Sequence, residues 1–246
     1  MHLQIYKNAE ETTIALADWI AALIKKTLEA KDRFTIALSG GETPKKLYQT
    51  LASDAYREKI NWSRLHIFWG DERFVPFSDD RNNAKMAFDN LLNKINISSE
   101  QIHTMWTDVT PEASAKQYEN LLHKYFDEKQ TTFDLVLLGM GDDGHTLSLF
   151  PNNEVLDDTT SWVSAVASKE KGERITLMPT VVNKSSAIAF LITGEAKAKV
   201  LQQVLESQQH NFPAQLIQPA NGELYWFVDE AAAKYLHRVN AEGGSE

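Results

Sequence analysis

Residues 34–44 read FTIALSGGETP, and this stretch decides the fold class. Residues 34–38 have the length and apolar content of a buried strand, which the glycines after Ser39 bring to an end. Thr43 and Pro44 then indicate a helix start, with Thr43 as the N-cap and Pro44 as the first helical residue. A buried strand that leads through a glycine turn into a helix is the first half of a βαβ unit.

Predicted strands and helices continue to alternate on both sides of this unit. Apolar runs predict further strands at residues 65–69, 133–138, 162–167, 188–192 and 224–228, and an alternating pattern predicts a short strand within 1–7. Helical spacing of apolar residues marks 12–30, 83–94, 111–126, 195–206 and 229–237. Strands that alternate with helices predict an α/β protein whose mostly parallel sheet is covered by helices on both faces.

Composition narrows the class of protein. The chain has 246 residues, and its 25 Lys and Arg against 34 Asp and Glu give a net charge of −9, which argues against nucleic-acid binding. The absence of cysteine excludes disulfides, thiolate-bound metal clusters and thiol nucleophiles.

No apolar run is long enough for a membrane helix, and no secretory signal is recognisable, so we expect a cytoplasmic protein. No linker divides the chain, which predicts one domain over residues 1–240 and a frayed tail at 241–246.

The first polar cluster at a strand end is Ser39-Gly40-Gly41-Glu42-Thr43. Ligands of open α/β sheets bind outside the carboxyl ends of the strands, so such clusters are candidate sites. The glycines allow a ligand to approach the backbone, and the N-terminus of the following helix offers N–H donors to an anion such as phosphate. The alternative is a tight turn that needs glycine for its geometry alone.

The second cluster is Gly70-Asp71-Glu72-Arg73, after the strand predicted at 65–69. The Arg73 guanidinium can bind a phosphate or carboxylate with two hydrogen bonds, and an adjacent carboxylate can orient it. A surface ion pair is the alternative, and metal binding by Asp71 and Glu72 is a weaker third possibility, because no suitably spaced histidine accompanies them.

The third cluster spans residues 139–146 and reads GMGDDGHT. It contains G-x-G-x-x-G, but two aspartates would occupy the place of a dinucleotide pyrophosphate, which argues against an NAD site. Asp143 and His145 instead resemble a carboxylate that orients a general base, although a histidine bonded into the turn would give the same pattern. Arg174 and Lys197 are basic residues near predicted element ends; each alone is typical of a solvated surface charge.

Taken together, these clusters resemble the 6-phosphogluconolactonase family. The resemblance is carried by SGGETPKKLY at 39–48, WGDERFVP at 69–76, GMGDDGHTLSLFP at 139–151, RIT at 174–176, GEAKAKVL at 194–201 and LYWFVDEAAA at 224–233. It implies a three-layer α/β/α fold with a Rossmann-like sheet and hydrolysis of 6-phosphoglucono-δ-lactone without a metal or cofactor. It also implies the site residues: His145 as catalytic base, with Asp143 and Asp71 beside it as catalytic residues, Arg73 in the active site, and Ser39, Gly40, Gly41, Thr43, Arg73, Arg174 and Lys197 as ligands of the substrate, chiefly of its phosphate.

Three positions depart from the family pattern. Glu42 adds a negative charge to the loop expected to bind phosphate, so we expect its side chain to point away from the ligand. Leu147 stands where alanine is common in the family, and we expect it to tighten the pocket. Residues 77–83 differ from the family pattern and are assigned no role. The alternatives are a glucosamine-6-phosphate deaminase or isomerase on the same fold, and a sugar-phosphate sensor without catalysis. The expected partner is a small phosphosugar lactone, with no nucleic acid or membrane and a monomeric or small homo-oligomeric state.

Overall fold

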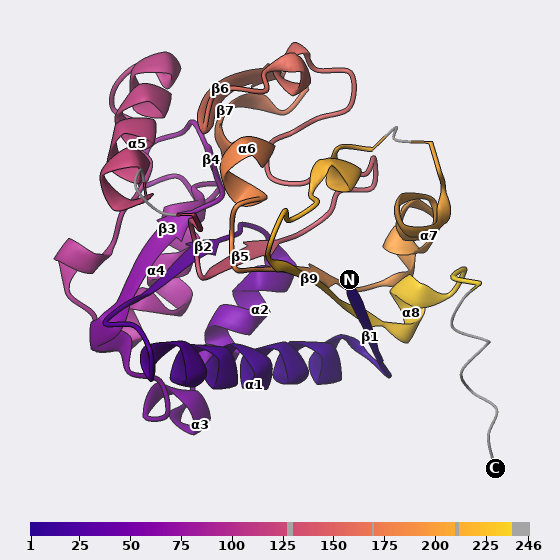
Figure 1. Cartoon of the computed structure of the whole chain (residues 1–246), viewed down its shortest axis with the longest axis horizontal. Helices are drawn as coiled ribbons and strands as arrows, with labels where there is room; N and C mark the ends of the chain where they lie inside the picture. Colours follow the sequence, from indigo (N-terminus) through magenta and orange to yellow (C-terminus); the bar gives the residue numbers. More distant parts are fainter. Residues whose placement is uncertain (127–129, 169, 210–211, 238–246) are drawn as a thin grey trace.

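A parallel sheet of six strands forms the centre of the described part of the computed structural model, which covers residues 1–126, 130–168, 170–209 and 212–237 (Figure 1). In spatial order the strands are β1 (His2–Tyr6), β9 (Glu223–Asp229), β8 (Ala187–Ile192), β5 (Leu135–Leu138), β2 (Phe34–Leu38) and β3 (Leu65–Trp69). The chain runs outward from β2 to β3 and then returns to β5 on the other side of β2, so a topological switch point lies between β2 and β5.

Helices cover both faces of this sheet. They are α1 (Ala9–Leu28), α2 (Glu42–Leu51), α3 (Asp54–Arg57), α4 (Asn83–Asn90), α5 (Pro111–Phe126), α6 (Pro179–Val182), α7 (Ala198–Glu206) and α8 (Glu230–Ala233). In Figure 1, α1 and α2 lie on one side of the sheet, and α5 and α6 lie on the other. The prediction of a three-layer α/β fold with a mostly parallel sheet is therefore confirmed.

A second, smaller sheet packs on the α5 side and was not predicted. It is antiparallel, in the order β4 (Asp71–Arg73), β7 (Gly172–Leu177) and β6 (Val163–Ser168). The strand expected at 162–167 thus belongs to this sheet and not to the parallel one. Gly70 joins the two sheets, because its N–H donates to the Leu38 carbonyl at 2.8 Å and its carbonyl accepts from the Leu177 N–H at 2.7 Å.

Several predicted boundaries need correction. The N-cap of α2 is Gly41 and not Thr43, so the helix begins two residues earlier than the Thr-Pro signal indicates. The helix expected at 83–94 ends at Asn90 and continues as a separate 3₁₀ turn at 92–94, and the one expected at 195–206 begins with a 3₁₀ turn. The predicted boundary between a domain and a tail at residue 240 lies outside the described residues.

Buried tyrosines fix two strand ends. The Tyr48 hydroxyl of α2 donates to the Ser39 carbonyl at 2.6 Å and accepts from the Ser39 N–H at 3.0 Å. The Tyr118 hydroxyl of α5 accepts from the Trp69 N–H at 2.9 Å. Both side chains are fully buried, so each helix is tied to the point where a strand gives way to a polar loop.

Candidate active site

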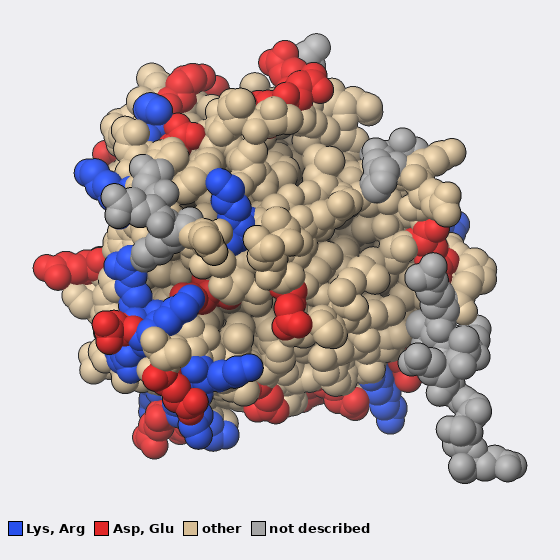
Figure 2. Space-filling model, viewed as in Figure 1, with Lys and Arg blue, Asp and Glu red and all other residues tan. Residues whose placement is uncertain are grey.

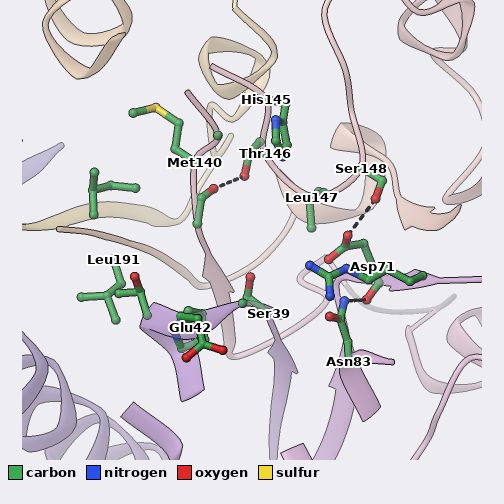
Figure 3. Close-up of a pocket in the computed structure, with 18 of the residues that line it drawn as sticks. Ser39, Glu42, Asp71, Asn83, Met140, His145, Thr146, Leu147, Ser148 and Leu191 are labelled. Carbon is green, nitrogen blue, oxygen red and sulfur yellow. Dashed lines mark hydrogen bonds between the residues drawn. The ribbon is translucent and has the colours of Figure 1, made fainter. Parts of the chain in front are cut away.

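A cavity of about 350 Å³ opens at the carboxyl ends of β2, β5 and β8, with β4 and β7 forming another wall (Figure 3). It lies at the switch point of the parallel sheet, where α/β folds bind ligands. Nine of the ten residues predicted for the site line it: Ser39, Gly40, Gly41, Thr43, Asp71, Arg73, His145, Arg174 and Lys197. The tenth, Asp143, stands behind His145 and contacts its ring.

The loop after β2 forms one side of the cavity, and it packs closely against α4. A Cβ atom at Gly40 would lie 1.9 Å from the Asn83 Oδ1 atom, so no side chain fits there. Asn83 is 1% exposed, and its amide Nδ2 donates to the Asp71 carbonyl at 2.9 Å (Figure 3). This asparagine, which the sequence did not single out, therefore holds the loops after β2 and β3 together.

We expect Gly40→Ala to lower both stability and substrate affinity. The added methyl group must displace the buried Asn83 side chain, and overpacking of this kind costs about 1–3 kcal/mol. Thermal unfolding should show a lower Tm, and KM should rise because the loop moves. In the double variant Gly40→Ala/Asn83→Ala the clash is removed, so the two substitutions should be less harmful together than their sum. Strict additivity would show that the clash is not the cause.

The register of the small sheet brings charged side chains into the cavity. Arg73 lies opposite Arg174, and Asp71 lies opposite Thr176. Residues two apart on a strand share a face, so these four side chains project to the same side. The two guanidinium groups stand next to each other and can together bind a doubly charged anion.

Glu72 points to the opposite face and is fully buried. Its carboxylate accepts hydrogen bonds from the backbone N–H groups of Arg73, Asn83 and Ala84 at 2.7–2.8 Å, and so caps α4. Burial raises its pKa to about 7, against the opposing effect of these donors. Glu72 does not line the cavity, and among the residues that the structure describes no group of three or more His, Asp or Glu side chains could hold a metal ion.

The Asp71 side chain is held in place by Ser148. Its Oδ2 atom accepts from the Ser148 hydroxyl at 2.7 Å, and Ser148 is held in turn by its N–H, which donates to Thr176 Oγ1 at 3.1 Å (Figure 3). The preceding residue, Leu147, has a φ of 55°, a left-handed conformation that is strained for leucine. Its side chain lines the cavity, and whether it tightens the pocket relative to alanine stays a prediction.

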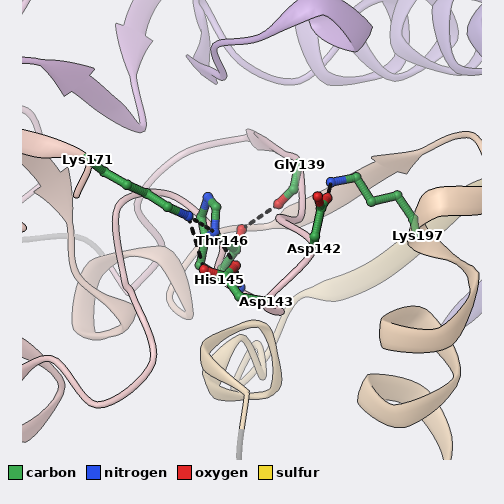
Figure 4. A network of polar contacts seen from close by, with 7 residues as sticks. All are labelled: Gly139, Asp142, Asp143, His145, Thr146, Lys171 and Lys197. Carbon is green, nitrogen blue, oxygen red and sulfur yellow. Dashed lines mark hydrogen bonds and ion pairs between the residues drawn. The ribbon is translucent and has the colours of Figure 1, made fainter.

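His145 lies at the other side of the cavity, in the loop after β5. Its Nδ1 atom contacts Asp143 Oδ1, and the His145 N–H also donates to that carboxylate oxygen at 3.2 Å (Figure 4). Burial would raise the pKa of Asp143, but its hydrogen bonds with His145 and Lys171 outweigh burial and hold the pKa well below the usual range. The ionised Asp143 accepts the Nδ1 proton, which leaves Nε2 as the basic atom of the ring.

The surroundings of His145 favour its neutral ring at pH 7. Burial lowers its pKa below the ordinary value of 6.5, and this effect exceeds the raising effect of Asp143. A Cβ atom at Gly141 would lie 2.1 Å from the ring, so only glycine lets the imidazole rest against the backbone here. The loop thus presents a neutral, oriented imidazole, which is the form that a general base requires.

Two further charges stand at the cavity edge. Lys197 forms an ion pair with Asp142, which competes with any anion for the charge of this lysine (Figure 4). Glu42 lines the edge, but its side chain is 84% exposed and faces Lys45 at 3.5 Å, in keeping with a carboxylate directed to solvent. On the face shown in Figure 2, acidic and basic side chains are interspersed.

Sequence reasoning missed Lys171, Asn83 and Ser148. Ser148 lies within the recognised motif at 139–151, and Asn83 ends the stretch 77–83, to which no role was assigned; their position in or beside the motifs was the available signal. Lys171 belongs to the charged stretch SKEKGER at 168–174, and no pattern in that stretch indicates a residue of a binding or catalytic site. It reaches the cavity only because β7 pairs with β4.

Fold and cavity together define an α/β protein with an enzyme-like site for a small anionic molecule. The chain belongs to the family of glucosamine-6-phosphate isomerases and 6-phosphogluconolactonases, whose model matches residues 7–226. No helix in the described ranges has both the length and the apolar content needed to span a membrane.

Curated relatives and solved structures agree with this assignment. A 6-phosphogluconolactonase of Nostoc sp. is 39% identical over 89% of this chain and 91% of its own, and a probable 6-phosphogluconolactonase 1 of Arabidopsis thaliana is 33% identical over 96% and 94%. The solved 6-phosphogluconolactonase of Trypanosoma brucei matches with a TM-score of 0.83 at 28% identity, over 96% of this chain and 98% of that one. A monomeric glucosamine-6-phosphate deaminase, 20% identical with a TM-score of 0.80 over 95% and 99%, shares the fold.

Proposed function

We propose that this chain is an enzyme that hydrolyses 6-phospho-D-glucono-1,5-lactone to 6-phospho-D-gluconate, a step of the oxidative pentose phosphate pathway. The observation that carries the proposal is the neutral His145, oriented by Asp143, in one cavity with Asp71 and the Arg73–Arg174 pair. The names of curated relatives that match along nearly the whole chain support the same activity.

The reaction needs one base that later acts as an acid. His145 Nε2 takes a proton from a water molecule while the water oxygen bonds to the lactone carbonyl carbon C1. The resulting oxyanion is stabilised by N–H donors or a nearby cation of the cavity. When the intermediate collapses, the bond between C1 and the ring oxygen breaks, and the imidazolium returns its proton to that oxygen. The new carboxylic acid then ionises and releases one proton to solvent.

The phosphate group binds away from the reacting carbon. The backbone N–H groups of the Ser39–Thr43 loop, with Arg73, Arg174 and Lys197, supply donors and positive charge inside an acidic protein. This binding holds C1 near His145 and so contributes to the rate through positioning. Asp71, fixed by Ser148, is placed to orient a substrate hydroxyl or the water molecule.

Two alternatives have weaker support. The deaminase reading rests on a structural likeness at 20% identity, which extends to the fold alone, whereas the curated relatives cited above are lactonases. A protein that only binds a sugar phosphate as a sensor would not need a histidine oriented as a general base. Acid release from freshly made 6-phosphogluconolactone in a pH-stat, beside ammonia release from glucosamine 6-phosphate, separates the three. Turnover of the lactone alone is expected, and binding without turnover of either compound would refute the proposal.

Lactonase activity should be insensitive to EDTA. The proposed steps use only an imidazole, carboxylates, cations and water, and no step is assigned to a metal ion. We expect equal initial rates in the pH-stat with and without excess EDTA after prolonged preincubation. Loss of activity that one divalent ion restores would contradict the proposed mechanism.

A further inference from the structure

Lys171 reaches the cavity from the small sheet, directly before β7. Its Nζ atom lies 3.0 Å from Asp143 Oδ2 and 3.3 Å from His145 Nδ1 (Figure 4). The ammonium group also lies 4.9 Å from the centre of the Phe150 ring, whose face favours a cation. Asp143 therefore bonds His145 through one oxygen and Lys171 through the other.

We propose that Lys171 is a positioning residue for the His145 base: its ammonium holds Asp143 in place and, beside the ring, opposes the formation of imidazolium. This inference rests on the proposed role of His145 in lactone hydrolysis. No role for Lys171 follows from the motifs of the sequence, since it lies outside all of them.

The proton arrangement shows why the contact with the ring is electrostatic. His145 Nδ1 carries the proton that Asp143 accepts, so it cannot also accept a hydrogen bond from Lys171. At 3.3 Å a positive charge remains beside an atom that turns cationic when the base is protonated. The ammonium thus favours the neutral ring before attack and makes the imidazolium a stronger acid toward the ring oxygen of the lactone.

The charges that face His145 come from three elements. Burial is the largest influence and lowers the pKa of His145; Asp143 raises it, Lys171 lowers it, and Asp71 on β4 raises it. Removing the Lys171 ammonium removes the positive charge that opposes the Asp143 and Asp71 carboxylates, so the pKa of the His145 ring rises. Since the base works when neutral, activity should then be lost at a higher pH than in the wild type.

The test is the pH dependence of kcat/KM for Lys171→Met, which keeps the length of the side chain and removes its charge. We expect the acid limb to move to higher pH by roughly half to one pH unit, so that kcat/KM falls about 3- to 10-fold at pH values well below the wild-type midpoint and much less at pH 8. Lys171→Arg keeps the charge and should restore the wild-type profile. Lys26→Met, on the exposed side of α1, is the matched control and should leave the profile unchanged.

NMR titration of the His145 ring without substrate provides a second measurement. The midpoint should rise in Lys171→Met and stay at the wild-type value in Lys171→Arg and Lys26→Met. A uniform loss of activity at every pH with an unchanged ring titration would overturn the proposal, and so would a higher KM alone, which would indicate direct substrate binding by Lys171. Because the titration needs no substrate, it separates failure of this inference from failure of the lactonase proposal, which would appear as an inactive wild type.

Discussion

Replacing His145 by alanine should lower kcat of lactone hydrolysis by about 10²- to 10⁴-fold while the protein stays folded. The imidazole is the proposed base of the cavity, and no other described histidine lines that cavity. Its side chain is 23% exposed and lies in a loop, so its loss creates no large core cavity. Initial rates in the pH-stat, beside thermal unfolding, measure both expectations.

The matched control is His237→Ala, whose side chain is 81% exposed and pairs with Glu206 at the surface. It should retain wild-type kcat. Asp143→Asn offers a finer test, because the amide cannot accept the Nδ1 proton as strongly and the preferred tautomer is lost. If His145→Ala retained kcat within a few-fold of wild type, His145 would not be the base.

The second large effect is expected at Arg73 and Lys197, the proposed ligands of the substrate phosphate. Each charge-assisted contact contributes roughly 1.5–3 kcal/mol, so Arg73→Ala or Lys197→Ala should lower kcat/KM for the phosphorylated lactone by about 10- to 100-fold. The wild-type enzyme should also prefer this substrate to plain gluconolactone by orders of magnitude. Lys197 is expected to show the smaller effect, since Asp142 competes for its charge.

Measuring both substrates with each variant isolates the phosphate contact. Only the phosphorylated lactone presents a partner to these side chains, so the plain lactone should be nearly unaffected. Arg57→Ala, at an exposed ion pair with Asp54, serves as the control for loss of a surface arginine. Equal losses for both substrates would place the residue at the lactone end or in a structural role.

The parts of the fold with a strong local signal were predictable. The predicted bounds 34–38, 65–69 and 111–126 coincide with β2, β3 and α5. The two strands are short apolar runs ended by glycine, and the helix has regular apolar spacing with proline at its start, so local sequence alone determines them. The loops after β2, β3 and β5 were expected to meet because the carboxyl ends of parallel strands share one edge of a sheet, whereas Arg174 and Lys197 were assigned to the site only through the family resemblance.

The rest depends on pairing between distant segments. Strand β4 has three residues, and nothing near residues 71–73 indicates that they pair with residues 174–176. The small sheet was therefore missed, and with it the position of Lys171. The Thr43 N-cap was wrong because Gly41, at a φ of 110°, already begins the helix, a conformation that the sequence permits without requiring.

The Gly70 junction also bears on motion. Its two backbone hydrogen bonds, at 2.8 and 2.7 Å, connect the parallel sheet to the small one at the base of the cavity. The junction therefore joins the wall that carries the Ser39–Thr43 loop to the wall that carries the two arginines, and a hinge motion between these walls would have to break it. Side chains at the mouth, such as Lys197 and Glu42, can rearrange without breaking this junction.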